Sequence, residues 1–258
     1  MKITSFIIAA LAVFITFDSF SEPVKTPRRR RPAHMAKPSG GLIFSEIKGK
    51  AIAIINFDKV AKDKALNETI NDIKLHIRIP IKIVEVPKGA ILTNEVESLR
   101  KKEDVSAVIA LSNCECTKLL KYEQERNIVY INVSALSKDR APTKIVNSRL
   151  NKQIWRAVGA ILNAGEPSMG PSIIKRADTI KELDAIKASL PEPMQHNRMV
   201  TAIDNLGMKM IKAGTYRSAC QQGWAPAPNN EEQKKIWNEF HATPKNPIKI
   251  TFDPKKGR

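Results

Sequence analysis

The sequence predicts an α/β protein: a mixed, mostly parallel sheet of about four strands, a central core helix and a helical C-terminal extension. Three observations predict this class. Short runs of β-branched apolar residues alternate with segments of helical apolar spacing, which is typical of parallel strands joined by right-handed crossovers. One longer amphipathic helix follows them, and further helical patterns separated by prolines fill the last third. With 258 residues and 42% hydrophobic residues, the chain can form a substantial core.

The first 21 residues have the features of a signal peptide. Lys2 precedes the apolar run Phe6–Phe17, which is too short to span a bilayer comfortably. Ser19 and Ser21 are small residues at the −3 and −1 positions, so cleavage is expected near Ser21. We therefore expect an exported protein of bacterial type, periplasmic or extracellular. No later run is apolar enough to predict a transmembrane segment in the mature chain.

Residues 22–41 form a basic arm rich in Pro and Arg. Because it has almost no large apolar side chains, it is expected to be disordered. Its cationic cluster is a candidate polyanion contact or a soluble spacer, and consists of Arg28, Arg29, Arg30 and Arg31. The net charge of +17 favours acidic partners such as acidic glycans, lipopolysaccharide or an envelope protein, unless it only solvates the surface. Nucleic acid is not favoured, because no aromatic residues are interleaved with the arginines.

The expected core spans residues 42–174. Its elements are predicted in this order: strand Lys50–Phe57, helix Asp63–Ile77, strand Ile81–Val86, helix Asn94–Lys102, strand Val105–Leu111 and strand Ile128–Val133. The segment between the last two strands is interpreted as a loop. Because ligands tend to bind near strand ends in open α/β sheets, this loop is either a candidate rim of a site or an ordinary connection.

A central helix is predicted at the start of the stretch Arg149–Ile174. One apolar stripe runs along it: Leu150, Ile154, Ala157, Val158, Ile161 and Leu162. Gly165 lies where a left-handed cap would end the helix, and Pro167 prevents its continuation.

Residues 175–258 form the expected helical extension and tail. Thr179 and Glu182 form a capping box for a helix that reaches about Ser189. Further helices are predicted over Arg198–Ala213 and Glu231–His241, and an edge strand over Ile248–Phe252.

The three cysteines are Cys114, Cys116 and Cys220. In an exported protein they allow one disulfide and one free thiol. Cys114 or Cys116 could pair with Cys220, and the sequence leaves this choice open. A metal or redox role for the C-x-C pair is less favoured, because a second cluster at matching spacing is missing.

The element order and the final long helix resemble the first subdomain of metzincin zinc peptidases, and of archaemetzincin-like proteins among them. The resemblance covers roughly Lys50–Ile174. The run Trp155–Gly165, WRAVGAILNAG, lies where these peptidases have H-E-x-x-H-x-x-G-x-x-H. In that motif two histidines on one helix face and a third after a glycine turn bind zinc, and the glutamate is the general base.

This chain has lost the motif. Trp155 and Gly159 occupy the first two ligand positions, Arg156 the position of the base, Leu162 that of the turning glycine, and Gly165 that of the third ligand. An arginine is always charged and cannot deprotonate water. Sliding the register does not help, because no histidine occurs between His76 and His196. We therefore expect no catalytic residue, no metal site and no cofactor.

The sequence favours an exported non-catalytic protein with a degenerate metallopeptidase-like core that serves as a binding or envelope-associated module. The alternative is a secreted hydrolase, a peptidase or a glycan-processing enzyme, with unrecognised active-site residues. One arrangement open to such an enzyme is a cysteine nucleophile, Cys114 or Cys116, that meets His196 or His241 in space.

Overall fold

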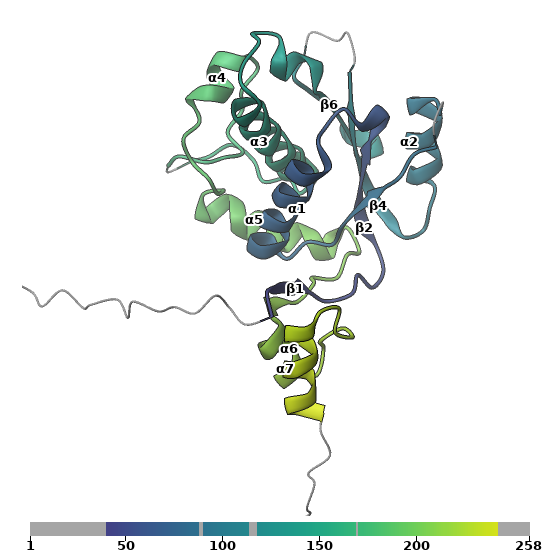
Figure 1. The fold of residues 1–258 in the computed structure, drawn as a ribbon. Helices are drawn as coiled ribbons and strands as arrows, with labels where there is room; N and C mark the ends of the chain where they lie inside the picture. The colour runs from purple at the N-terminus through teal and green to yellow at the C-terminus, as the bar shows by residue number, and fades with distance from the viewer. Residues whose placement is uncertain (1–39, 88–89, 114–117, 169, 242–258) are drawn as a thin grey trace, which may run out of the picture. The chain divides into compact units, whose positions relative to one another are not determined.

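The computed structural model describes residues 40–87, 90–113, 118–168 and 170–241, all within one compact unit, Lys37–Arg258 (Figure 1). Several predicted features lie outside the described residues: the signal peptide, the basic arm up to residue 39 with Arg28–Arg31, Cys114, Cys116 and the strand Ile248–Phe252. The predicted disorder is wrong for the end of the arm, because Gly40 is buried and its N–H donates to Glu232 at 2.9 Å. No helix in the described ranges is long and apolar enough to cross a membrane.

A five-stranded, mostly parallel sheet confirms the predicted fold class. Its strands lie in the order β3-β2-β4-β6-β5. Their bounds are Ala51–Asn56 (β2), Ile81–Val84 (β3), Val105–Ser112 (β4), Leu120–Glu123 (β5) and Ile128–Asn132 (β6). The first four strands are parallel to their neighbours, whereas β5 is antiparallel to β6. The sequence analysis had placed β5 in a loop.

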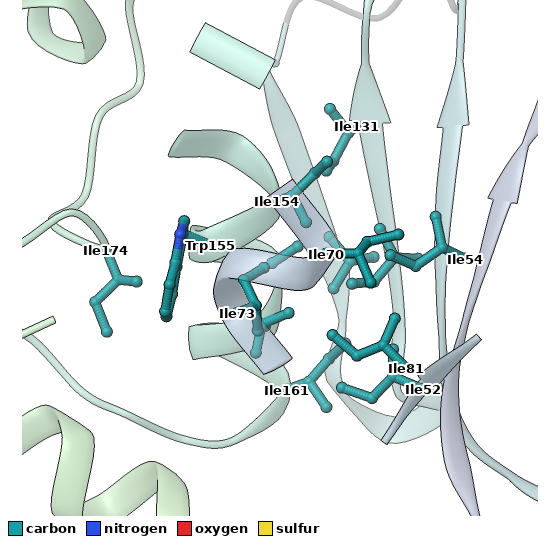
Figure 2. Close-up of a cluster of buried hydrophobic side chains, with 14 of the residues drawn as sticks. Ile52, Ile54, Ile70, Ile73, Ile81, Ile131, Ile154, Trp155, Ile161 and Ile174 are labelled. Atoms are coloured by element: carbon teal, nitrogen blue, oxygen red, sulfur yellow. The ribbon is translucent and has the colours of Figure 1, made fainter. Parts of the chain in front are cut away.

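Helices cover both faces of this sheet, which explains why β2 and β4 are almost continuously apolar. α1 (Asp63–Ile77) and α3 (Thr143–Ile161) lie together on one face, and the short α2 (Leu92–Arg100) lies on the other (Figure 1). Alternate residues of β2 belong to the two resulting clusters: Ile52 and Ile54 pack toward α1 and α3, and Ala53 and Ile55 toward α2. Figure 2 shows the larger cluster.

The central helix α3 begins six residues before the predicted stretch and ends four residues before the predicted cap. Its last turn is closed by Asn163, whose φ of +49° is left-handed. The Asn163 N–H donates to the Ala160 carbonyl and the Ala164 N–H to the Gly159 carbonyl, which is the Schellman arrangement. Gly165 is also left-handed, with φ +72°, but it lies in the turn beyond the helix.

Two helices follow α3 in the same compact unit. α4 (Ile180–Ala185) has the predicted capping box of Thr179 and Glu182, but it ends four residues early. α5 (Pro193–Asn205) replaces the predicted helix Arg198–Ala213, so that prediction is wrong at both ends. Pro193 lacks a backbone N–H and therefore fits the first helical turn, and Gly207, at φ +67°, ends the helix.

The remaining elements form a small assembly. β1 (Leu42–Phe44) pairs antiparallel with β7 (Ala213–Thr215), and α6 (Tyr216–Gln221) packs on α7 (Glu231–His241), which has its predicted bounds. The buried side chains of this assembly are Tyr216, Cys220 and Ile236. Short 3-10 turns occur at Phe57–Lys59, Gln124–Arg126 and Ser134–Ser137.

Candidate binding cleft

A cavity of about 1080 Å³ lies where the end of α3 meets strand β5. Residues 118–127 line one side of it, the last two turns of α3 its floor, and residues 174–178 the opposite side. It is therefore bounded by the segment that the sequence analysis named as a candidate rim. Three sequence-distant segments are needed to build it, and none has a recognisable motif.

One stripe of α3 faces this cleft. Arg156, Gly159, Ala160 and Asn163 follow the i, i+3, i+4, i+7 spacing of one helix face, and all line the cavity. Gly159 allows the segment at Ile174 to approach closely, because a Cβ added there would lie 3.1 Å from the Ile174 Cδ1. The floor is thus small and flat beside the long side chain of Arg156.

The residues named for the degenerate zinc motif separate into two groups. Arg156, Gly159 and Gly165 line the cleft. Trp155 does not: it is fully buried, and its indole N–H donates to Asp72 on α1 at 3.3 Å. A side chain at this position belongs to the core in Figure 2, because the cleft-facing stripe begins one residue later. The cleft-facing residues at i, i+4 spacing are therefore Arg156 with Ala160 and Gly159 with Asn163, and the chain turns at Asn163.

β5 is an edge strand of the described sheet, and its backbone can be assigned from its register. The Asn132 N–H donates to the Leu119 carbonyl at 3.1 Å, so Leu119 and Asn132 form a hydrogen-bonded pair. Such pairs alternate with pairs whose backbone groups point away from the partner strand. The N–H and C=O groups of Leu120 and Tyr122 therefore point away from β6, and both residues line the cleft.

Arg156 dominates the electrostatics of the floor. Burial lowers the pKa of its guanidinium, and the carboxylates of Asp178 and Glu166 partly oppose this effect. Neither carboxylate forms an ion pair with it; Asp178 instead accepts from Arg176 Nε at 3.0 Å. The Nη1 of Arg156 donates to Gln153 Oε1 at 3.0 Å, and this is its one hydrogen bond within the described residues.

The remaining chemically interesting side chains lie elsewhere. None of the described residues lining the cleft is a histidine or a cysteine. His76 and His196 meet at the surface, where His196 Nε2 lies 3.2 Å from the His76 carbonyl. Across the described ranges, no three His, Cys, Asp or Glu side chains are grouped as metal ligands.

Cys220 is a buried thiol in α6 that forms no disulfide with any described residue, and burial raises its pKa. The predicted pairing of Cys220 with Cys114 or Cys116 stays a prediction, because both possible partners lie outside the described residues.

Comparison with known proteins gives structural matches alone. No family model and no curated protein matches the chain. Archaemetzincin from Methanopyrus kandleri is similar at a TM-score of 0.48 and 11% identity, over 60% of this chain and 96% of that one. A zinc-dependent peptidase from Methanocorpusculum labreanum is similar at a TM-score of 0.45 and 10% identity, over 58% of this chain and 100% of that one. The expected resemblance to archaemetzincin-like proteins is thus confirmed, at a level that carries no argument about activity.

Proposed function

We propose that this chain is an exported, non-catalytic binding protein whose cleft binds an extended segment of another polypeptide along β5. The observation that carries this proposal is the edge strand at the cleft, with the backbone groups of Leu120 and Tyr122 directed away from the sheet. A chain lying beside β5 would satisfy these groups by strand addition, in which main-chain hydrogen bonds provide affinity and neighbouring side chains provide specificity.

The floor of the cleft supports binding over catalysis. General acid–base chemistry needs a group that gains and loses a proton near neutral pH. Arg156 faces the cavity but remains protonated, and the described carboxylate of Asp178 is engaged by Arg176. The alternative, a secreted hydrolase, would have to use Glu166, the other carboxylate of the described lining, which is exposed.

Export is part of the proposal and rests on residues 1–21 alone. A fusion of these residues to alkaline phosphatase, which folds to its active form only after export, should be active in a bacterial host. A fusion in which the Phe6–Phe17 run is interrupted by two lysines is the control. Equal activity of the two fusions would contradict export by this segment.

Strand addition has a direct test on the mature chain, residues 22–258. Peptides selected from a random phage-displayed library would be synthesised with a single N-methyl group at each successive position. Because alternate N–H groups of an added strand face β5, binding should weaken at every second position, by about tenfold or more. Affinity would be measured by fluorescence anisotropy.

Two proline variants provide the matched comparison. Leu120→Pro removes an outward N–H from β5 and leaves the bonds to β6 in place. Ile83→Pro removes an outward N–H from β3, the opposite edge strand. The Ile52 N–H donates to the Pro80 carbonyl, and in this register the N–H of Ile83 points away from β2. Only Leu120→Pro should weaken binding. Strand addition would be refuted if N-methylation did not weaken binding at every second position. It would also be refuted if both proline variants lost the same affinity for the peptide.

A further inference from the structure

We propose that Arg156 binds a carboxylate of the segment in the cleft, so that the ligand is an acidic polypeptide segment. This inference deepens the proposed function and rests on it. It assigns a recognition role to the one long charged side chain on the cleft-facing stripe of α3.

The guanidinium of Arg156 has unused hydrogen-bonding capacity. An arginine has five N–H donors in a planar fork, and a single hydrogen bond, from Nη1 to Gln153, involves this one among the described residues. A partly buried cation with unpaired donors is unfavourable, because burial removes water without supplying acceptors. A ligand carboxylate would supply two acceptors in the geometry that the fork matches best.

Gln153 fixes the position of this guanidinium. It lies one helical turn before Arg156, is fully buried, and accepts from the Arg156 Nη1. Beyond Arg156 this stripe has Gly159, against which the Ile174 side chain packs, and the small residue Ala160. The bond to Gln153 therefore orders the guanidinium before a ligand arrives, which lowers the cost of binding.

The other charges of the cleft do not replace this role. Arg176 lines the same cavity, but its Nε already donates to Asp178, and both side chains are more than three-fifths exposed, at 69% and 65%. An exposed pair of this kind contributes little to binding, because water screens it. Arg176 therefore has the same charge in the same cavity but is largely exposed to water, whereas Arg156 is partly buried, and Arg176 provides a matched control.

The test uses two synthetic peptide pools rich in β-branched residues, identical except that a central Glu in one is Gln in the other. Each pool is made with a C-terminal acid and with a C-terminal amide, which distinguishes a side-chain carboxylate from the chain terminus. Affinities for the mature chain, and for Arg156→Gln, Arg156→Lys and Arg176→Gln, are measured by anisotropy. Circular dichroism melting checks that each variant is folded.

The wild type should bind one carboxylate pool at least tenfold more tightly than its neutral counterpart. Arg156→Gln should reduce this preference to less than about twofold. Arg156→Lys, which keeps the charge and loses the fork, should lose more than half of the preference. Arg176→Gln should retain it.

Each of the following results would overturn the inference. A preference that survives in Arg156→Gln would exclude this residue as the anchor. Equal losses of the carboxylate preference in Arg156→Gln and Arg176→Gln would indicate general attraction between charges. Arg156-dependent binding of heparin without peptide binding would assign the site to sulfated glycans instead. Binding of both pools with a two-residue N-methyl period but no carboxylate preference refutes this inference alone, whereas binding of neither pool refutes the proposed function as well.

Discussion

Two arginines on α3 lie seven residues apart and differ in every respect that decides a role. Arg149 is 3% exposed, and each of its N–H donors has an acceptor. Its partners are Asp139, Asp184 and the Leu136 carbonyl, at 2.6–2.9 Å. Arg156 is partly buried beside a cavity and donates one hydrogen bond. Both guanidinium groups lose contact with water on folding, but only the donors of Arg149 all find acceptors within the fold.

The difference indicates a structural role for Arg149 and is consistent with the ligand-binding role that we propose for Arg156. The Arg149 network joins α3 to α4 through Asp184 and to the turn after Ser134–Ser137 through Asp139, so it fixes the N-terminal half of the helix. The C-terminal half borders the cleft and leaves its cation incompletely satisfied. A fully satisfied buried charge resists change, whereas an unsatisfied one is stabilised by whatever ligand completes it.

The largest effect is expected from removing the satisfied arginine. Arg149→Met leaves the Leu136 carbonyl and two carboxylates without their donor, and we expect a loss of about 2–4 kcal/mol in the free energy of unfolding. Urea denaturation followed by circular dichroism would measure it. Arg140→Met, which removes a neighbouring charge outside the network, is the control. Equal stability of the two variants would contradict the role assigned to Arg149.

The sequence predicted the sheet because its central strands are buried on both faces. Runs such as residues 51–56 and 105–111 are nearly all Ile, Val and Ala, and most of these side chains are buried. It also predicted α1 and α7, whose apolar stripes are regular. β5 was missed because its segment is mostly polar, although Leu120 and Tyr122 alternate with Lys121 and Glu123 as in a strand with one buried face.

The cleft was harder to predict than the fold. Of the four positions named for the degenerate zinc motif, Arg156, Gly159 and Gly165 line the cleft and Trp155 is buried in the core, a difference that the sequence pattern alone does not predict. The sequence analysis named Arg156 only as the position of a missing catalytic base. Whether its remaining donors find acceptors depends on segments 118–127 and 174–178, which line the same cavity and are distant in sequence. No local pattern predicts which of two arginines will be paired.

A smaller effect should appear at low pH. The Arg149 guanidinium lowers the pKa of Asp139 to about 2 and also lowers that of Asp184. A carboxylate with a lowered pKa in the folded state contributes its stability above its ordinary pKa, and this contribution is lost as the pH falls toward 2. Unfolding free energies measured from pH 5 to pH 2 should therefore fall more steeply in the wild type than in Arg149→Met. Parallel pH profiles would mean that the network is not intact in solution.

The smallest effect on stability should come from removing the unsatisfied arginine. Arg156→Met keeps the length of the apolar stem and removes a desolvated cation with one acceptor, Gln153. We expect the unfolding free energy to stay within about 0.5 kcal/mol of the wild type or to rise by up to about 1 kcal/mol. The same urea titration used for Arg149→Met measures it. A loss as large as that of Arg149→Met would show that Arg156 stabilises the fold, and the contrast between the two halves of α3 would then fail. A neutral or stabilising result means that the free protein tolerates a cost at Arg156, which is expected of a side chain retained for a ligand.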